Sequence, residues 1–175
     1  MLKIILGLSL FLLLTACNSA VEIHPTSTQP PPTPTSTPEP ECAATMAPDF
    51  AGYASWTRVN PKPVKGHEKY VNIYVNDLAR DTYLSASGKI FPTCAMIVKQ
   101  HLENVDSKNI TALTVMLKMP AGYDSDHNDW WWGMYDKDGK VAEMSGKVDV
   151  CIACHQPAAN ADYVFSHKTM EEINK

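Results

Sequence analysis

The stretch Tyr70-Val71-Asn72-Ile73-Tyr74-Val75 gives the first indication of the fold. Its aliphatic residues alternate with tyrosine and asparagine, and a period of two is typical of a β-strand that turns one face toward a core. Asn76 follows directly. Because asparagine is a favoured helix N-cap, we expect a short helix over residues 77–85.

Further strands are expected beyond that helix. Three segments bounded by turn-forming residues are rich in β-branched and aromatic side chains: 94–101, 111–119 and 130–135. The sequence Asp136-Lys137-Asp138-Gly139 suits a tight hairpin, so residues 141–144 should pair antiparallel with the last of these strands.

The remaining segments are expected to be helical. Helix is predicted from residue 149 onward, with a last short helix from about residue 168 to the end. No βαβ alternation is visible. The sequence therefore predicts an α+β fold, with a mainly antiparallel β-sheet and a few flanking helices.

The most informative motif is Cys151-Ile152-Ala153-Cys154-His155, the pattern of covalent haem attachment. Two thiols one helical turn apart can each add to a vinyl group of one porphyrin, and the adjacent histidine can reach the iron. We therefore expect one covalent haem c near the C-terminus, bound through Cys151 and Cys154, with His155 as proximal iron ligand. A thioredoxin-like pair would need a βαβ unit and a zinc site a second ligand pair, and the sequence shows neither.

The N-terminus has the features of a bacterial lipoprotein signal peptide. Lys3 precedes the apolar run 4–14, and Leu14-Thr15-Ala16-Cys17 resembles a lipobox. We expect residues 1–16 to be removed and Cys17 to carry the lipid. The exported protein would then be anchored to a bacterial membrane, facing the periplasm or the cell exterior. An ordinary signal peptide is the alternative.

Two further regions follow the expected lipid anchor. Residues 17–41 are dominated by Pro, Thr and Ser and are predicted to form an extended tether. Residues 42–175 then make one haem domain. The formal net charge of −4 gives no electrostatic basis for nucleic-acid binding, so we expect small-molecule or protein partners.

Cys42 and Cys94 are the two cysteines that neither the lipid nor the haem accounts for. In an exported protein they are expected to form a disulfide, and two separate thiols are the alternative.

The sixth position of the iron is expected to be open. Small electron-transfer cytochromes usually carry the motif near the start of the domain, so that a downstream methionine can bind the iron. Here Met170 and His167 are the downstream candidates, and both lie on the predicted terminal helix. An open iron binds small molecules instead of only passing electrons.

Residues 56–165 carry a set of short motifs in a characteristic order. They are Trp56, Phe91-Pro92 followed by Ala95 to Lys99, Val115 to Lys118, Asp129-Trp130, the cysteine and histidine motif, and Asp162-Tyr163-Val164-Phe165. This arrangement resembles the cytochrome P-460 family, which includes the cytochromes c′-beta. The turn at Thr93-Cys94 departs from the family, where a glycine is usual.

The resemblance implies a β-rich homodimer with an open distal haem face. Some members of the family oxidise hydroxylamine to nitrous oxide or nitric oxide, whereas the c′-beta proteins bind nitric oxide. Lys99 matches the lysine that hydroxylamine-oxidising members bond to the porphyrin edge. Strand alternation places Lys99 on the same face as Ala95 and Ile97.

The distal residue stays open at this point. Hydroxylamine oxidation needs a proton acceptor near the iron, and Asp129 and Glu143 are the first candidates, with Asp126 and His127 more typical of a solvated loop. A nitric oxide binder instead needs an apolar distal face. Three aromatic residues would suit it: Phe50, Phe91 and Trp132.

Three functions are therefore compatible with the sequence. The first is a hydroxylamine-oxidising enzyme that passes electrons to a redox partner protein. The second is a nitric oxide binding protein with the same haem. The third is an anchored electron carrier whose iron has six ligands. The open iron position favours the first two, and the sequence does not choose between them.

Overall fold

The computed structural model describes Cys42 and residues 48–66, 68–86 and 88–174. All described residues belong to one compact unit. The predicted signal peptide, the lipidation at Cys17 and the tether to residue 41 lie outside the described residues.

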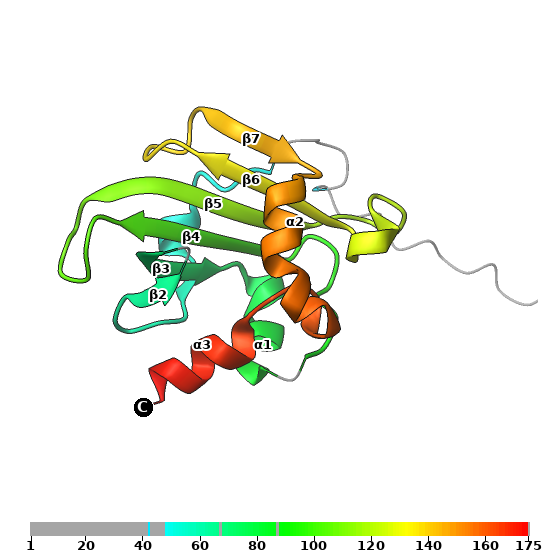
Figure 1. Cartoon of the computed structure of the whole chain (residues 1–175), viewed down its shortest axis with the longest axis horizontal. Coiled ribbons are helices and arrows are strands. Elements are labelled where there is room, and N and C mark those ends of the chain that lie inside the picture. The colour runs from blue at the N-terminus through cyan, green and yellow to red at the C-terminus, as the bar shows by residue number, and fades with distance from the viewer. Residues whose placement is uncertain (1–41, 43–47, 67, 87, 175) are drawn as a thin grey trace, which may run out of the picture. The chain divides into compact units, whose positions relative to one another are not determined.

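The described part of the chain contains one seven-stranded antiparallel sheet. Its strand order is β1-β3-β4-β5-β6-β7, and β2 pairs with β3 (Figure 1). The predicted α+β fold with a mainly antiparallel sheet is confirmed. The strands are β1 (Thr57–Arg58), β2 (Val64–Gly66), β3 (Lys69–Val75), β4 (Met96–Leu102), β5 (Ile110–Lys118), β6 (Trp130–Tyr135) and β7 (Ala142–Gly146).

The helices are short, and α1 begins where its capping residue predicts. Asn76 caps α1 by accepting a hydrogen bond from the Ala79 N–H at 3.0 Å, as its position predicts. No helix in the described ranges is long and apolar enough to cross a bilayer. The helices are η2 (Tyr53–Ser55), α1 (Asp77–Ser85), η3 (Ser125–His127), α2 (Asp149–His155), η4 (Gln156–Ala161) and α3 (Ser166–Ile173).

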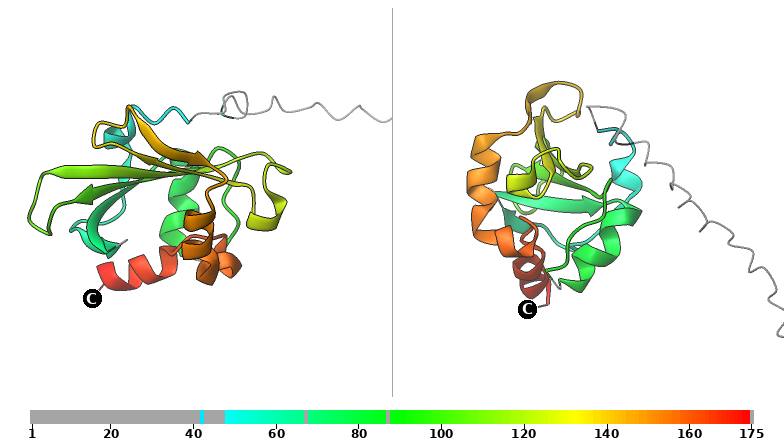
Figure 2. Two further views of the ribbon diagram at one scale, coloured as in Figure 1. Left: turned by 45° about the horizontal axis from the view of Figure 1, so that its top comes forward. Right: turned by 90° about the vertical axis from the view of Figure 1, so that its right-hand side faces the viewer.

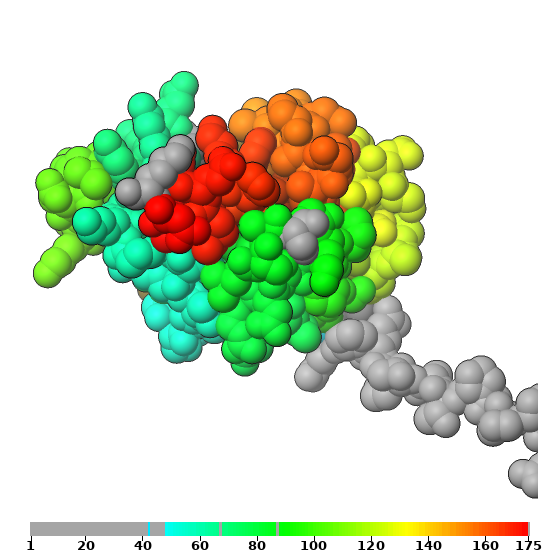
Figure 3. Space-filling model, turned by 90° about the horizontal axis from the view of Figure 1, so that it is seen from below, coloured from blue at the N-terminus to red at the C-terminus, as the bar shows by residue number. Residues whose placement is uncertain are grey.

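The two faces of the sheet bury two separate cores. One core joins the sheet to α1, α2 and the segment after η4, through residues such as Ile73, Tyr83, Ile152 and Val164. In the left view of Figure 2, α1, α2 and α3 lie below the sheet. Viewed from that side, α1 and the C-terminal helices cover neighbouring parts of the surface (Figure 3).

The second core lies on the opposite face of the sheet. Phe50, in the segment before β1, packs there with alternate residues of β4 to β6, among them Val98, Leu113 and Trp131. Cys42 packs against this core and forms a disulfide with Cys94, with Cα atoms 5.8 Å apart. The bridge attaches the start of the domain to the turn that leads into β4.

Candidate functional site

The motif residues lie on α2, which packs against the first core. Cys154 is exposed, Cys151 is partly buried, and the His155 side chain is buried with 4 % of its surface exposed. Because Cys151 and Cys154 are three residues apart on a helix, both thiols lie on one side of it. The helix therefore presents two thiols and one buried imidazole to the same region.

The orientation of His155 is fixed by a backbone carbonyl. Its Nδ1 atom lies 2.6 Å from the carbonyl oxygen of Tyr163, which can only accept, so Nδ1 donates. The unprotonated nitrogen is then Nε2, the form of imidazole that binds metals. The ring packs against Trp132, with ring centroids 4.8 Å apart, and against Phe165 at 5.3 Å.

His155 is also held in its neutral form. Burial, reinforced by the positive charge of Lys99, lowers the pKa of His155 to about 4, although the hydrogen bond to Tyr163 acts in the opposite direction. A neutral imidazole is available to a metal without first losing a proton.

Three adjoining cavities surround these side chains, with volumes of about 40, 270 and 500 Å³. The first cavity is lined by His155, Cys151, Trp132, Met116 and Thr114, among others, and shares Lys99 with the second. The third shares Thr114 and Cys151 with the first and has a largely apolar wall. That wall includes Ala112, Met134, Met144 and Val150.

These residues fit a covalently attached haem. The cavities lie between the sheet and the helix that carries both thiols, and their walls are apolar where a porphyrin would lie. The Nε1 atom of Trp132 is buried in the lining of the first cavity without a hydrogen-bond partner among the described residues. This N–H is suited to donate a hydrogen bond to a polar group of a ligand in the cavity.

A zinc site is not supported by the same region. Within the described residues, no group of three or more His, Cys, Asp or Glu side chains is arranged to hold a metal ion. The donors gathered here are one imidazole and two thiols on a single helix, which suits haem attachment rather than a tetrahedral site.

Lys99 lies at the junction of two cavities. It is on β4, opposite Ile73 of β3 and Thr114 of β5, and its side chain is partly buried. Burial lowers the pKa of Lys99 to about 8, and the nearby Cys154 partly offsets this shift. A substantial fraction of this amine is therefore neutral, and nucleophilic, at neutral to mildly alkaline pH.

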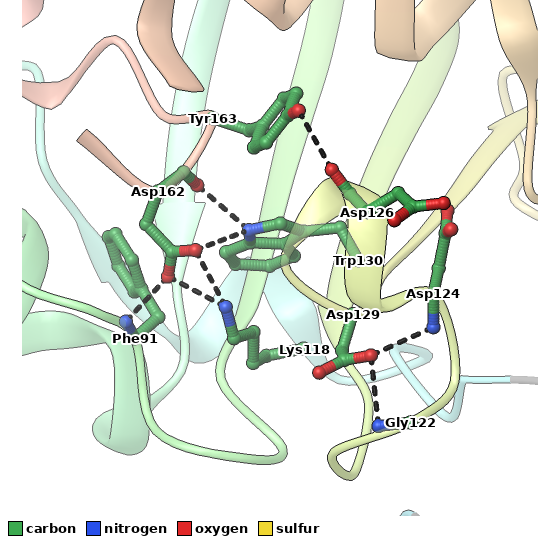
Figure 4. A network of polar contacts seen from close by, with 9 residues as sticks. All are labelled: Phe91, Lys118, Gly122, Asp124, Asp126, Asp129, Trp130, Asp162 and Tyr163. Atoms are coloured by element: carbon green, nitrogen blue, oxygen red, sulfur yellow. Dashed lines mark hydrogen bonds and ion pairs between the residues drawn. The ribbon is translucent and has the colours of Figure 1, made fainter. Parts of the chain in front are cut away.

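The predicted distal carboxylates lie away from the three cavities. The Asp129 carboxylate accepts hydrogen bonds from the N–H groups of Gly122, at 3.1 Å, and Asp124, at 2.8 Å, and so braces its own loop (Figure 4). His127 pairs with Asp124 in that loop. Glu143 is exposed on β7, although its neighbour Met144 lines the third cavity.

The Asp126 backbone carbonyl lies 3.4 Å from the hydroxyl of Tyr163. The structure therefore places the Asp126 loop beside the segment that supports His155, but not in the cavity lining.

The aromatic candidates occupy three different places. Trp132 contacts His155 and lines the first cavity. Phe91 packs in the first core, with its ring centroid 5.6 Å from that of Trp130. Phe50 is in the second core, on the opposite face of the sheet. Only Trp132 of the three borders the cavities.

The downstream candidates for the sixth iron ligand lie elsewhere. Met170 and His167 line a separate surface groove with Ala86, Glu171 and Asn174. None of these residues lines the three cavities next to His155.

Two polar residues of the cavity wall were not identified from the sequence. His101 lines the third cavity, and its Nε2 atom lies 3.1 Å from Oγ1 of Thr114. Burial, with the charges of Lys99 and Lys69, lowers the pKa of His101 to about 4. The alternation that put Lys99 on this face also puts His101 there, two residues on, so the signal was present.

A buried ion pair supports the segment after the motif. Nζ of Lys118 lies 2.6 and 2.8 Å from the two carboxylate oxygens of Asp162 (Figure 4). The same carboxylate accepts a hydrogen bond from the N–H of Phe91 at 2.7 Å, and Nε1 of Trp130 donates to the backbone carbonyl of Asp162 at 2.8 Å. The motifs at Phe91, Lys118, Trp130 and Asp162, far apart in the sequence, thus meet in one network.

Comparison with known proteins agrees with this arrangement. The family model described as Cytochrome P460 matches residues 50–166, which include the whole sheet and the motif helix. A search of curated proteins found no match.

Proposed function

Since the chain belongs to the cytochrome P460 family, it is a haem cytochrome, and we propose that it oxidises hydroxylamine to nitric oxide or nitrous oxide at an open iron site. One haem c would be bound through Cys151 and Cys154, with His155 as proximal ligand. The observation that carries the proposal is the buried His155 imidazole, oriented by the Tyr163 carbonyl beside cavities that both cysteines line.

A haem held by Cys151, Cys154 and His155 would supply an iron atom able to bind the nitrogen compound and accept its electrons. Oxidation of one hydroxylamine to nitric oxide releases three protons and three electrons. Oxidation of two to nitrous oxide and water releases four of each. The electrons would pass to an external redox partner protein, and the protons would leave to solvent through groups of the cavity wall.

His101 and Thr114 are the best placed proton acceptors. Both line the third cavity, and the hydrogen bond between them allows the hydroxyl to pass a proton to the neutral imidazole. We assign this role to them in preference to Asp129 and Glu143, which do not line the cavities.

Lys99 is proposed to form a bond from Nζ to the porphyrin edge. Its position in two cavities and its lowered pKa support this role. Formation of the bond replaces one N–H and one C–H and releases two protons and two electrons, which an oxidant of the dioxygen or peroxide class must accept.

Nitric oxide binding without turnover is the second candidate. The apolar wall of the third cavity, with Met134, Met144 and Val150, favours it because apolar surroundings of a haem exclude water from a bound gas. This candidate requires neither the Lys99 bond nor a proton acceptor.

The proposal also covers the location and the oligomeric state of the protein. Family members are generally exported, and we propose that a lipid on Cys17 anchors this one to a bacterial membrane. We further propose a homodimer, which the exposed apolar side chains of Met144 and Val150, beside the third cavity, support.

The first test is the ferrous absorption spectrum and intact mass of the haem-loaded protein. The enzyme would be supported by the absorption band from which the family takes its name, together with hydroxylamine-dependent dye reduction. The band should be lost in Lys99→Met and kept in Lys140→Met, the control at an exposed site. An ordinary high-spin spectrum that responds to nitric oxide without turnover would favour the binder. A low-spin spectrum indifferent to ligands would contradict both and indicate an electron carrier.

A further inference from the structure

The carbonyl that orients His155 is presented by an unusual backbone turn. Asp162 and Tyr163, directly after η4, both have left-handed conformations, with φ of 55° and 61°. Side chains other than glycine disfavour this region, and two such residues in succession persist only where surrounding contacts hold them. The turn directs the Tyr163 carbonyl to Nδ1 of His155.

The contacts that hold this turn converge on Asp162. Its carboxylate is fully buried and meets Lys118, at the end of β5, and the N–H of Phe91, in the segment before β4. Trp130, at the start of β6, donates to its backbone carbonyl, as Figure 4 shows. Asp162 of the turn is therefore bonded to three different parts of the sheet region.

Among the described residues, the polar head of Lys118 contacts Asp162 and the Trp130 ring, which both belong to this network. The Lys118 side chain is buried, with 7 % of its surface exposed, and Nζ lies 5.0 Å from the centre of the Trp130 ring. It does not line any of the three cavities. Burying an ammonium group costs desolvation free energy, and the ion pair with Asp162 offsets this cost at Lys118.

We propose that Lys118 and Asp162 are positioning residues for the iron ligand. Their ion pair holds the left-handed turn, and the turn holds the Tyr163 carbonyl on Nδ1 of His155. This inference rests on the proposed function only in taking His155 as the proximal ligand of the haem. It does not depend on which nitrogen compound reacts.

The consequence for the iron is electronic. A short hydrogen bond from Nδ1 to a carbonyl increases the electron density on Nε2 and makes the imidazole a stronger donor. A stronger axial donor favours the ferric state and lowers the reduction potential. Loosening the turn should therefore weaken the iron to histidine bond and raise the potential.

The test compares four variants of the haem-loaded protein. Lys118→Met removes the cation, and Asp162→Asn removes the anion while keeping a residue that tolerates the left-handed region. Lys137→Met and Asp138→Asn are the controls, because these residues form an exposed ion pair of similar length, 2.8 Å. The readouts are the ferrous iron to histidine stretching frequency, by resonance Raman spectroscopy, and the reduction potential.

In the core variants, Lys118→Met and Asp162→Asn, we expect the stretching frequency to fall and the reduction potential to rise. In Lys137→Met and Asp138→Asn we expect both quantities to stay unchanged. Core variants that lose thermal stability but keep the wild-type frequency and potential would overturn the inference, because the pair would then be structural alone.

Two further variants keep the test decisive if a single core variant does not fold. The double variant Lys118→Met with Asp162→Asn leaves no unpaired buried charge. Trp130→Phe removes the indole N–H that reaches Asp162, together with part of the buried ring, and leaves the ion pair in place. Both should shift the frequency in the same direction, Trp130→Phe by less. An unchanged frequency in both would overturn the inference.

The experiment separates this inference from the proposed function. A five-coordinate ferrous wild-type protein with no iron to histidine mode would refute His155 as the ligand and would overturn both proposals. A wild-type protein that shows the mode and the expected variant shifts, but does not oxidise hydroxylamine, would refute the proposed enzyme and leave the positioning role intact.

Discussion

Nε2 of His101 and Oγ1 of Thr114 lie 3.1 Å apart on the neighbouring strands β4 and β5, in the wall of the third cavity. Thr114 is also directly opposite Lys99 in the register of the two strands. The sheet thus places an amine, a hydroxyl and an imidazole side by side, facing the helix that carries both cysteines.

Stability should depend on pH through His101. Its pKa is about 4 in the folded protein, below the ordinary value of 6.5. As the pH falls from about 6.5 to 4, the unfolded chain takes up a proton that the folded protein does not, so the free energy of unfolding decreases. His101→Gln should remove about 1–2 kcal/mol of this decrease.

Urea unfolding of the haem-loaded protein across that pH range measures the effect. The exposed His167→Gln variant is the control and should follow the wild type. A His101→Gln protein with the same pH profile as the wild type would show that His101 is not protected from protonation by the fold.

Loss of the Thr114 hydroxyl should slow turnover. If this hydroxyl passes substrate protons to His101, Thr114→Val should lower kcat for hydroxylamine about 10- to 100-fold, with a smaller change in KM. Thr111→Val is the matched control, since Thr111 lines the same cavity but bonds to the backbone of His101 rather than to its ring. Equal rates for the two variants would contradict the assignment.

The disulfide should make a large contribution to stability. Cys42 and Cys94 are separated by 52 positions, and closing a loop of that length removes unfolded-state entropy worth about 4 kcal/mol at most. Cys42→Ala should therefore lower the urea midpoint clearly, while the absorption spectrum of the haem stays unchanged. A thiol reductant should lower the midpoint of the wild type but have no further effect on Cys42→Ala.

Gly133 has no space for a side chain. A Cβ atom there would lie 2.5 Å from the Trp131 ring and 2.8 Å from the Tyr135 ring. Gly133→Ala should destabilise the protein by about 1–3 kcal/mol through overpacking. At Gly52 the nearest atom would be 4.0 Å away, so Gly52→Ala should be close to neutral in the same thermal melts. Similar melting temperatures for the two variants would refute this account.

Much of the fold could be read from local patterns. The alternation in Tyr70 to Val75 predicted β3, Asn76 predicted the start of α1, and the Asp136 to Gly139 turn predicted the β6-β7 hairpin, all of which the structure contains. The short strands β1 and β2 were not predicted. Two or three residues show no period, and such strands form only because β3 offers an edge to pair with.

The sequence by itself determined the motif of Cys151, Cys154 and His155, because haem attachment depends on spacing within one helical turn. It also placed Lys99 on the inward face of its strand. Only the tertiary structure decided which polar groups line the cavities. Asp129 had the right chemistry, but its carboxylate braces a loop, whereas His101 and Thr114 meet across two strands.

The link from Lys118 to Asp162 and on to His155 was also decided by tertiary structure alone. The two charged residues are 44 positions apart. Both stand in motifs of the family resemblance, but no local pattern in the sequence pairs one with the other. A periodic pattern reports which face of an element is buried, but it does not report what packs against that face. Long-range contacts therefore determine how His155, the proposed iron ligand, is held.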